Sequence, residues 1–160
     1  MSRNLVATTL VIHACPSALV DSVSDLLPQS DMRWFNQPLL VGTSRAELKI
    51  KLNSLELEEL VSKLLRIDGL YLDIMQQGRE AGVWFMLAPG LGLFRAEINA
   101  AGEIMLNEER VRTALEQSAG NHREVSRLLR IALGQAWDDI LEPFRAARYQ
   151  SNLAVINRAV

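Results

Sequence analysis

Residues that build redox and metal sites are scarce in this sequence. Its 160 residues include one cysteine, Cys15, and two histidines, His13 and His122. A single cysteine excludes an intramolecular disulfide and a cysteine-based metal site, and two histidines argue against a histidine cluster. We therefore expect no metal, no cofactor and a location in the reducing cytoplasm.

Long apolar runs are also missing. No segment approaches the roughly 20 apolar residues that a membrane-spanning helix needs. The apolar run Leu5–Ala14 follows Arg3 and precedes Cys15, as in an exported protein, but it is short and rich in β-branched residues. These two features favour a buried strand over a signal peptide, and we expect no membrane partner.

Lysine contributes little of the positive charge, since Lys49, Lys51 and Lys63 are the only lysines. The formal net charge is -2, and this acidic balance argues against a nucleic-acid partner, which requires a basic surface. The remaining positive charge is arginine, which suits paired carboxylates and flat interfaces. Codon usage in a GC-rich genome is an alternative explanation for that bias.

The first half of the chain alternates between strand and helix patterns. Apolar or alternating runs predict strands, and apolar residues at helical spacing predict helices. In chain order we predict the strand Leu5–Ala14, the helix Ser17–Leu27, the strands Met32–Gln37 and Thr43–Leu52, a helix capped by Asn53 with Glu56, and the strand Leu70–Met75. This order predicts an α+β fold with a ferredoxin-like βαββαβ core.

A second group of short strands follows. The segments Val83–Leu87 and Leu91–Asn99 flank a Pro-Gly turn, and a second turn leads to Glu103–Met105. This pattern predicts a β-hairpin that extends the core. We therefore assign residues 1–106 to an α/β sandwich with a hairpin extension and residues 107–160 to a C-terminal helical lobe, within one compact unit.

The C-terminal lobe is predicted to be a helical pair. Asn107 caps a helix that ends near Ser118, and Asn121 caps a longer helix with Glu124 at capping-box spacing. Apolar residues continue at helical spacing as far as Ile140. Pro143 is predicted to break or kink this longest helix.

The segment from Ala136 to Arg145 carries aromatic, acidic and basic side chains on one helix. Aromatic residues and arginine are enriched where proteins bind each other. We select as candidate partner-binding residues Trp137, Asp138, Glu142, Phe144 and Arg145. The alternative is that the aromatic residues pin the helix to the sheet and the carboxylates pair with arginine or face water.

Arginines at helical spacing form a second candidate surface. Arg123, Arg127 and Arg130 lie on one face of the predicted longest helix. They could hold an anionic partner, such as the phosphopantetheine arm of a carrier protein or the phosphates of an acyl-CoA. The alternative is a solvated helix face.

No catalytic motif stands out. His13 and Cys15 lie two apart on a predicted strand and so would point to the same side, which allows a Cys–His dyad, although buried packing is the favoured explanation. Ser17 lacks the context of a nucleophile elbow, and the Pro89–Gly92 segment lacks the lysine of a phosphate-binding loop. We predict that the protein is not an enzyme.

Several short motifs resemble the DUF3145 family, an actinobacterial family of unknown function. The resemblance covers most of the chain and is carried by Pro16-Ser17-Ala18, Trp34, Arg45-Ala46-Glu47, Leu91-Gly92-Leu93-Phe94, Gly102-Glu103-Ile104, Ala136-Trp137-Asp138 and Leu141-Glu142-Pro143-Phe144-Arg145. These are packing and turn residues. The resemblance implies a cytoplasmic protein whose relatives include some encoded beside fatty-acid synthesis genes.

Together these features suggest a regulatory or adaptor protein that binds a larger enzyme of fatty-acid or acyl-CoA metabolism. An acyl-CoA carboxylase is the most specific partner we expect, and a homodimer is a further possibility. The alternative function is a sensor for a small acyl or CoA-type ligand, and a Cys15-dependent enzyme is a third.

Overall fold

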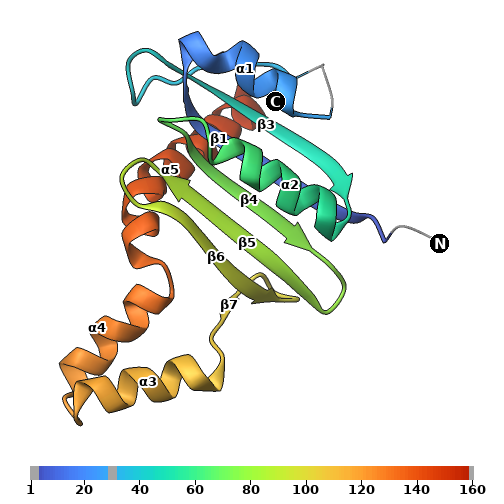
Figure 1. The fold of residues 1–160 in the computed structure, drawn as a ribbon. Coiled ribbons are helices and arrows are strands. Elements are labelled where there is room, and N and C mark those ends of the chain that lie inside the picture. Colours follow the sequence, from blue (N-terminus) through green and yellow to red (C-terminus); the bar gives the residue numbers. More distant parts are fainter. Residues whose placement is uncertain (1–3, 29–31, 159–160) are drawn as a thin grey trace.

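The computed structural model describes residues 4–28 and 32–158, with side chains described as far as Arg148. Within these residues the protein has an α+β fold, with one seven-stranded sheet in which all neighbouring strands are antiparallel (Figure 1). The order across the sheet is β2 (Phe35–Asn36), β3 (Thr43–Leu52), β1 (Val6–Pro16), β4 (Tyr71–Gln77), β5 (Ala81–Ala88), β6 (Gly92–Asn99) and β7 (Ile104–Met105).

The helices lie between strands in the first half of the chain and follow the last strand in the second. They are the short 3-10 helix η1 (Ser17–Leu19), α1 (Val20–Leu26), α2 (Ser54–Leu64), α3 (Glu108–Ser118), α4 (His122–Ala132) and α5 (Gln135–Arg158). Among the described residues, no helix combines the length and the apolar composition needed to cross a bilayer.

Local patterns predicted several elements well. The bounds of β3 are those predicted, because its side chains alternate between a buried and a wet face. The side chain of Asn53 caps α2 by accepting the Glu56 backbone N–H at 2.8 Å. The predicted hairpin is confirmed as β5 and β6, which extend the same sheet. The strand predicted at Met32–Gln37 is shorter, since only Phe35–Asn36 pairs with β3.

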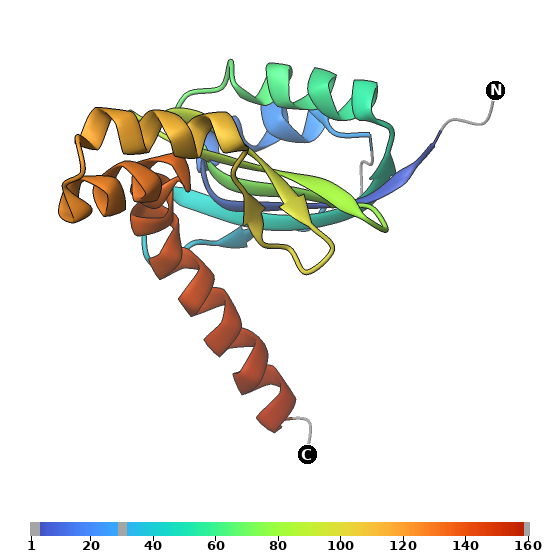
Figure 2. The same ribbon diagram turned by 90° about the horizontal axis from the view of Figure 1, so that it is seen from below.

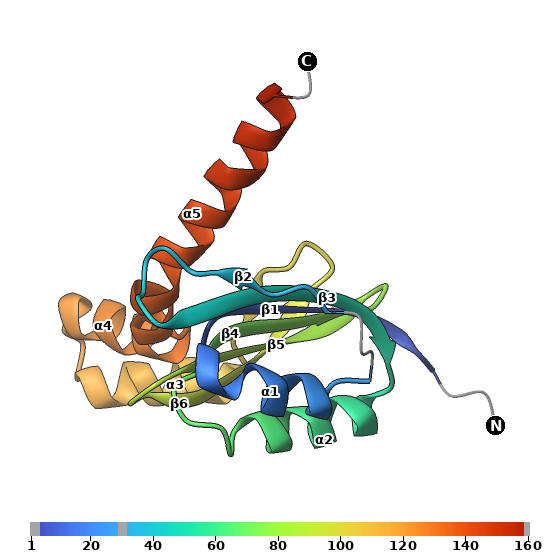
Figure 3. The same ribbon diagram turned by 90° about the horizontal axis from the view of Figure 1, so that it is seen from above.

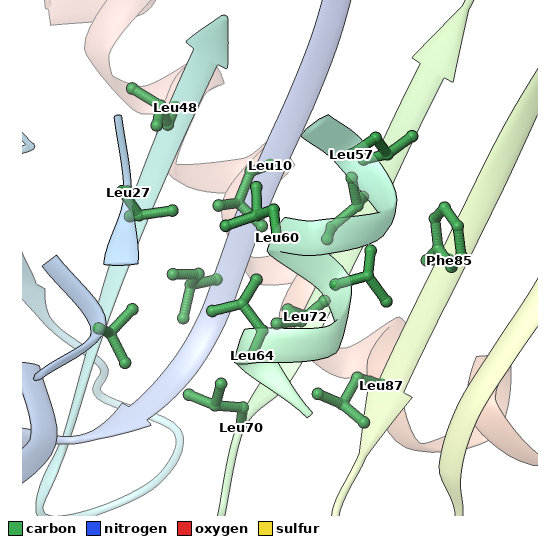
Figure 4. Packing of buried hydrophobic residues seen from close by; sticks show 14 of the residues in the cluster. Leu10, Leu27, Leu48, Leu57, Leu60, Leu64, Leu70, Leu72, Phe85 and Leu87 are labelled. Atoms are coloured by element: carbon green, nitrogen blue, oxygen red, sulfur yellow. The ribbon is translucent and has the colours of Figure 1, made fainter. Parts of the chain in front are cut away.

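Helices α1 and α2 cover one face of the sheet (Figure 3). Apolar residues at helical spacing on α2 pack against the centre of the sheet, which places Leu60 and Leu64 over Leu10 of β1 and Leu72 of β4 (Figure 4). Leu10 and Leu72 are 1% exposed. Because β1 is covered on both faces over much of its length, its sequence is apolar almost throughout.

The predicted C-terminal helical pair is wrong, because three helices follow β7. The helix expected to run through residue 140 ends at Ala132, and Gly134 adopts a φ of 78° before α5 begins. A Cβ atom at Gly134 would lie 2.8 Å from Met86 Cε and 2.9 Å from Phe94. The break therefore lets the backbone turn while it lies directly on the sheet.

A break or a kink was predicted at Pro143, and the break is wrong, since α5 continues to Arg158 with Pro143 inside it. Proline removes one backbone hydrogen bond from the helix. Leu141 and Phe144 on either side of Pro143 are buried, so packing holds the helix where that bond is missing. The second half of α5 extends away from the sheet (Figure 2).

Candidate functional site

Helix α5 crosses the face of the sheet opposite α1 and α2 (Figures 2 and 3). Residues at helical spacing on α5 meet successive strands. Trp137 contacts β6, Arg145 contacts β4 and β5, and Arg148 contacts β3. The helix thus ties together strands that are distant in sequence.

Asp73 of β4 is the centre of the polar network beneath α5. Arg145 donates to it twice, from Nε to Oδ2 at 2.9 Å and from Nη2 to Oδ1 at 2.7 Å. His13 Nε2 lies 2.7 Å from Oδ2, and Trp84 Nε1 donates to Oδ1 at 2.9 Å. One carboxylate therefore joins β1, β4, β5 and α5 through four hydrogen bonds.

These bonds keep Asp73 ionised. Burial by itself would raise the pKa of Asp73, but the hydrogen bonds from His13 and Arg145, and their charge, lower that pKa to about 2. Burial likewise disfavours the charged form of Arg145, yet its hydrogen bonds to Asp73 and Asp138 raise its pKa above the ordinary value. Both groups are charged at neutral pH, and Nε2 is therefore the protonated nitrogen of His13.

Arg145 is enclosed on its remaining sides. Its Nη1 donates to Asp138 Oδ1 at 2.8 Å, and Glu142 Oε2 lies 3.6 Å away. Its Cζ lies 5.2 Å from the centroid of the Trp84 ring, which adds a cation–π contact. Its side chain is 21% exposed, so the guanidinium serves mainly contacts within the molecule.

The aromatic residues of the predicted patch pack on the sheet. The Phe144 ring stacks on His13 with centroids 5.9 Å apart and contacts Tyr71 at 5.3 Å. Trp137 Nε1 donates to the carbonyl of Gly92 at 3.0 Å, and its ring lies 5.2 Å from that of Phe94. These contacts are those of the packing alternative, while the role of the patch in partner binding stays a prediction.

A cavity of about 180 Å³ adjoins this network. It lies between α5 and the strands β1, β2 and β3, and His13 and Phe144 belong both to its wall and to the network. Its other lining residues include Phe35, Gln37, Arg45, Glu47 and Arg148.

The three arginines of the second candidate surface lie elsewhere, on α4. Arg123, Arg127 and Arg130 are exposed and line a shallow groove between α4 and the start of α5. Arg127 donates to Glu124 from Nε to Oε2 at 3.0 Å. The side chains of Arg123 and Arg130 have no partner among the described residues.

The buried packing favoured for Cys15 is confirmed, and the Cys–His dyad considered as its alternative is not formed. A register shift in β1 between Ile12 and Cys15 marks a bulge, which changes the alternation of side chains. Cys15 packs among the apolar residues beneath α1 and α2, whereas His13 joins Asp73 on the opposite face. Burial raises the pKa of Cys15 to about 11, which disfavours the thiolate.

Sequence reasoning missed Asp73, Trp84 and the pair formed by Glu47 and Arg148. One signal was present for Asp73, which is the only charged residue in the apolar strand Leu70–Met75. Buried strands carry a carboxylate only where a partner is provided. Among the described residues, no group of three or more His, Cys, Asp or Glu side chains could hold a metal ion.

The Asp73–His13 pair has one clear chemical property. A carboxylate bound to one ring nitrogen fixes the tautomer of a neutral imidazole and leaves the other nitrogen as an acceptor. Nδ1 of His13 has no hydrogen-bond partner among the described residues, and the ring lines the cavity. The site can therefore present a fixed acceptor, or a second donor when His13 is protonated.

A match to a known family covers both the sheet and the helix α5 that packs on it. A family model described as a protein of unknown function (DUF3145) matches residues 9–158, which include most of β1, the rest of the sheet and α5. No curated protein and no solved structure matches the chain. The match covers nearly all of the sequence, and the chain therefore belongs to the DUF3145 family of proteins of unknown function.

Proposed function

We propose that this protein is a non-catalytic regulatory or adaptor protein that binds a larger enzyme of fatty-acid or acyl-CoA metabolism. The observation that supports binding is the exposure of α4, in which no residue is buried. Helix α4 packs between α3 and α5, and the α3–α4 pair lies beyond the end of the sheet (Figure 1). An amphipathic helix left this open favours a protein partner.

The chemistry of α4 suggests the kind of surface it would meet. Ile131 is 54% exposed and Leu133 is 36% exposed, so apolar area is available beside the arginines. Arg123 and Arg130 offer unpaired positive charge within the described residues. The complementary surface has an apolar centre and carboxylates at its rim. An acyl-CoA carboxylase is our most specific partner, and that choice rests on the family resemblance.

Charge reversal on α4 tests this function. The tagged protein is used to capture partners from its native lysate, and any enzyme found is purified and its affinity measured at two salt concentrations. Arg130→Glu should weaken binding about tenfold or more, because it places a like charge against the carboxylates. Arg112→Glu is the matched control, since Arg112 is an exposed arginine on α3 that pairs with Glu108. Equal losses in both variants would count against α4 as the binding surface.

A second candidate function is a sensor for a small acyl-type ligand, and the cavity beside α5 favours it. Its volume is below the roughly 300 Å³ at which pockets for drug-sized ligands begin, so a whole CoA would extend outside it. A thermal-shift screen with acyl-CoAs and free short-chain acids tests the sensor function. A ligand that binds the folded state raises the melting temperature by mass action.

We further propose that the first four strands form a ferredoxin-like core in a cytoplasmic protein without nucleic-acid or membrane partners. The strand order β2-β3-β1-β4, its antiparallel neighbours and the position of α1 and α2 on one face support the fold assignment. A homodimer stays a prediction, which sedimentation analysis tests directly.

A further inference from the structure

The cavity beside α5 has a defined wall chemistry, and our inference from it rests on the second proposed function. Strand register places Phe35 opposite Arg45 and Val11 opposite Glu47, so these four side chains share the face that α5 crosses. Helix α5 closes the other side with Phe144 and Arg148.

The charge of the wall is unbalanced. Arg148 donates to Glu47 from Nη2 at 2.6 Å and from Nε at 3.2 Å, so these two residues neutralise each other. Arg45 has no hydrogen bond or ion pair among the described residues. Arg45 therefore lines the cavity without an opposite charge paired to it in the described part of the chain, and a carboxylate is the group that matches the geometry of a guanidinium.

Apolar groups form much of the remaining wall. Of the apolar residues that line the cavity, Phe144 is buried and Val11 is half-buried, whereas Phe35 on the edge strand β2 is 58% exposed. An exposed phenylalanine beside a cavity offers a flat surface for an aromatic ring or a short alkyl chain. The volume of 180 Å³ equals that of roughly six waters, which suits a small organic acid.

Neighbouring hydrogen bonds hold the cavity in shape without a ligand. Gln37 is 3% exposed, and its Nε2 donates to the carbonyl of His13 at 2.7 Å while its Oε1 accepts the Leu39 backbone N–H at 3.2 Å. His13 is fixed in turn by Asp73. A site that is already ordered loses less entropy when a ligand binds.

We infer that this cavity binds a small monocarboxylic acid, with Arg45 holding the carboxylate and Phe35 and Phe144 contacting the apolar body. Because Phe144 and Arg148 belong to α5, an occupied cavity also favours the docked position of that helix. The fraction of occupied cavities rises with the concentration of the acid. The stability of α5 on the sheet would thus rise with that concentration.

Two acids and their uncharged amides provide the probes. Benzoate and hexanoate are titrated into the full chain and followed by amide chemical shifts and by the melting temperature, with benzamide and hexanamide as controls of the same shape. We expect the acids to shift resonances of β3 and α5 and the amides to bind at least tenfold more weakly, because they lack the charge.

Variants of β3 locate the site. Arg45→Gln should weaken binding of the acids about tenfold, because it removes the charge-assisted bonds. Lys49→Gln removes one positive charge from the same face of β3 but lies outside the cavity wall, and it should leave binding unchanged.

The possible results distinguish the carboxylate site from the sensor function on which it rests. Acid binding that Arg45→Gln leaves intact would overturn the carboxylate site and keep the sensor function. Absence of binding by all four probes, together with no shift in the acyl-CoA screen, would overturn both. Absence of binding by the four probes, with a shift in that screen, would overturn the carboxylate site alone.

Discussion

Asp73 and Arg145 form a pair of charges that the fold encloses on several sides. Their side chains are 13% and 21% exposed, and each makes further hydrogen bonds to Trp84 or Asp138. Removal of one partner leaves the other partly desolvated without its main opposite charge, and this costs more than the intact pair contributes. The network thus stabilises one position of α5 over others.

Substitution of Arg145 tests this at the level of one residue. Arg145→Met should lower the free energy of unfolding by about 2–4 kcal/mol, as expected when a partly buried ion pair is broken. Arg112→Met is the control, because its exposed pair with Glu108 should contribute less than about 0.5 kcal/mol. Urea denaturation measures both, and a similar small loss in the two variants would contradict the role given to Arg145.

The low pKa of Asp73 predicts a pH dependence. The folded pKa is about 2 and the ordinary value is 3.8, so the folded state favours the ionised form. The stabilisation is present above about pH 4 and is lost as the pH falls toward 2, with a total near 2 kcal/mol. The difference in free energy of unfolding between wild type and Asp73→Asn should therefore shrink as the pH falls over that range. A difference that does not change with pH would show that the ionisation of Asp73 is not linked to folding.

At the scale of elements, Gly134 separates α4 from α5. Its positive φ and its close approach to Met86 and Phe94 both disfavour a side chain. Gly134→Ala should destabilise the protein by about 2–4 kcal/mol, because backbone strain and overpacking add. Gly42 has a similar φ of 79°, but a Cβ atom there would have nothing within 4 Å, so Gly42→Ala should cost only about 1 kcal/mol.

A calorimetric comparison of the two variants separates strain from packing. Equal destabilisation by both would show that the contact with the sheet at Gly134 contributes nothing beyond backbone strain.

Patterns local to one element were predictable. The alternation in Thr43–Leu52 and the cap at Asn53 involve residues within a few positions of each other, and both were found in the structure. The boundary between α4 and α5 was not predictable, because apolar residues keep helical spacing across Gly134. The turn at Gly134 depends on its contact with Met86 and Phe94 of the sheet, which are distant in sequence.

Features that depend on distant strands were missed. The bulge in β1 reflects its register against β3 and β4, which no local pattern records. Asp73 and Arg145 are 72 positions apart, so neither sequence neighbourhood identifies the other as its partner. The predicted patch on α5 contained Arg145 and Phe144, but the residues they contact came only from the fold.

At the scale of the molecule, the sheet carries two different layers. One face holds the large apolar core beneath α1 and α2, and the other holds α5, the charged network and the cavity. The α3–α4 pair lies apart from both (Figure 1). Substitutions on the α3–α4 pair therefore change a surface that is separate from the core and from the charged network.

The position of α5 after every strand has a consequence for synthesis. A ribosome completes β7 at Met105 before it reaches Arg145, and this interval lasts a few seconds at about 5–20 residues per second. During that time Asp73 has been synthesised, while Arg145, which pairs with it in the folded protein, has not. The face of the sheet that α5 covers can therefore be completed only after every strand and the last helix have been synthesised.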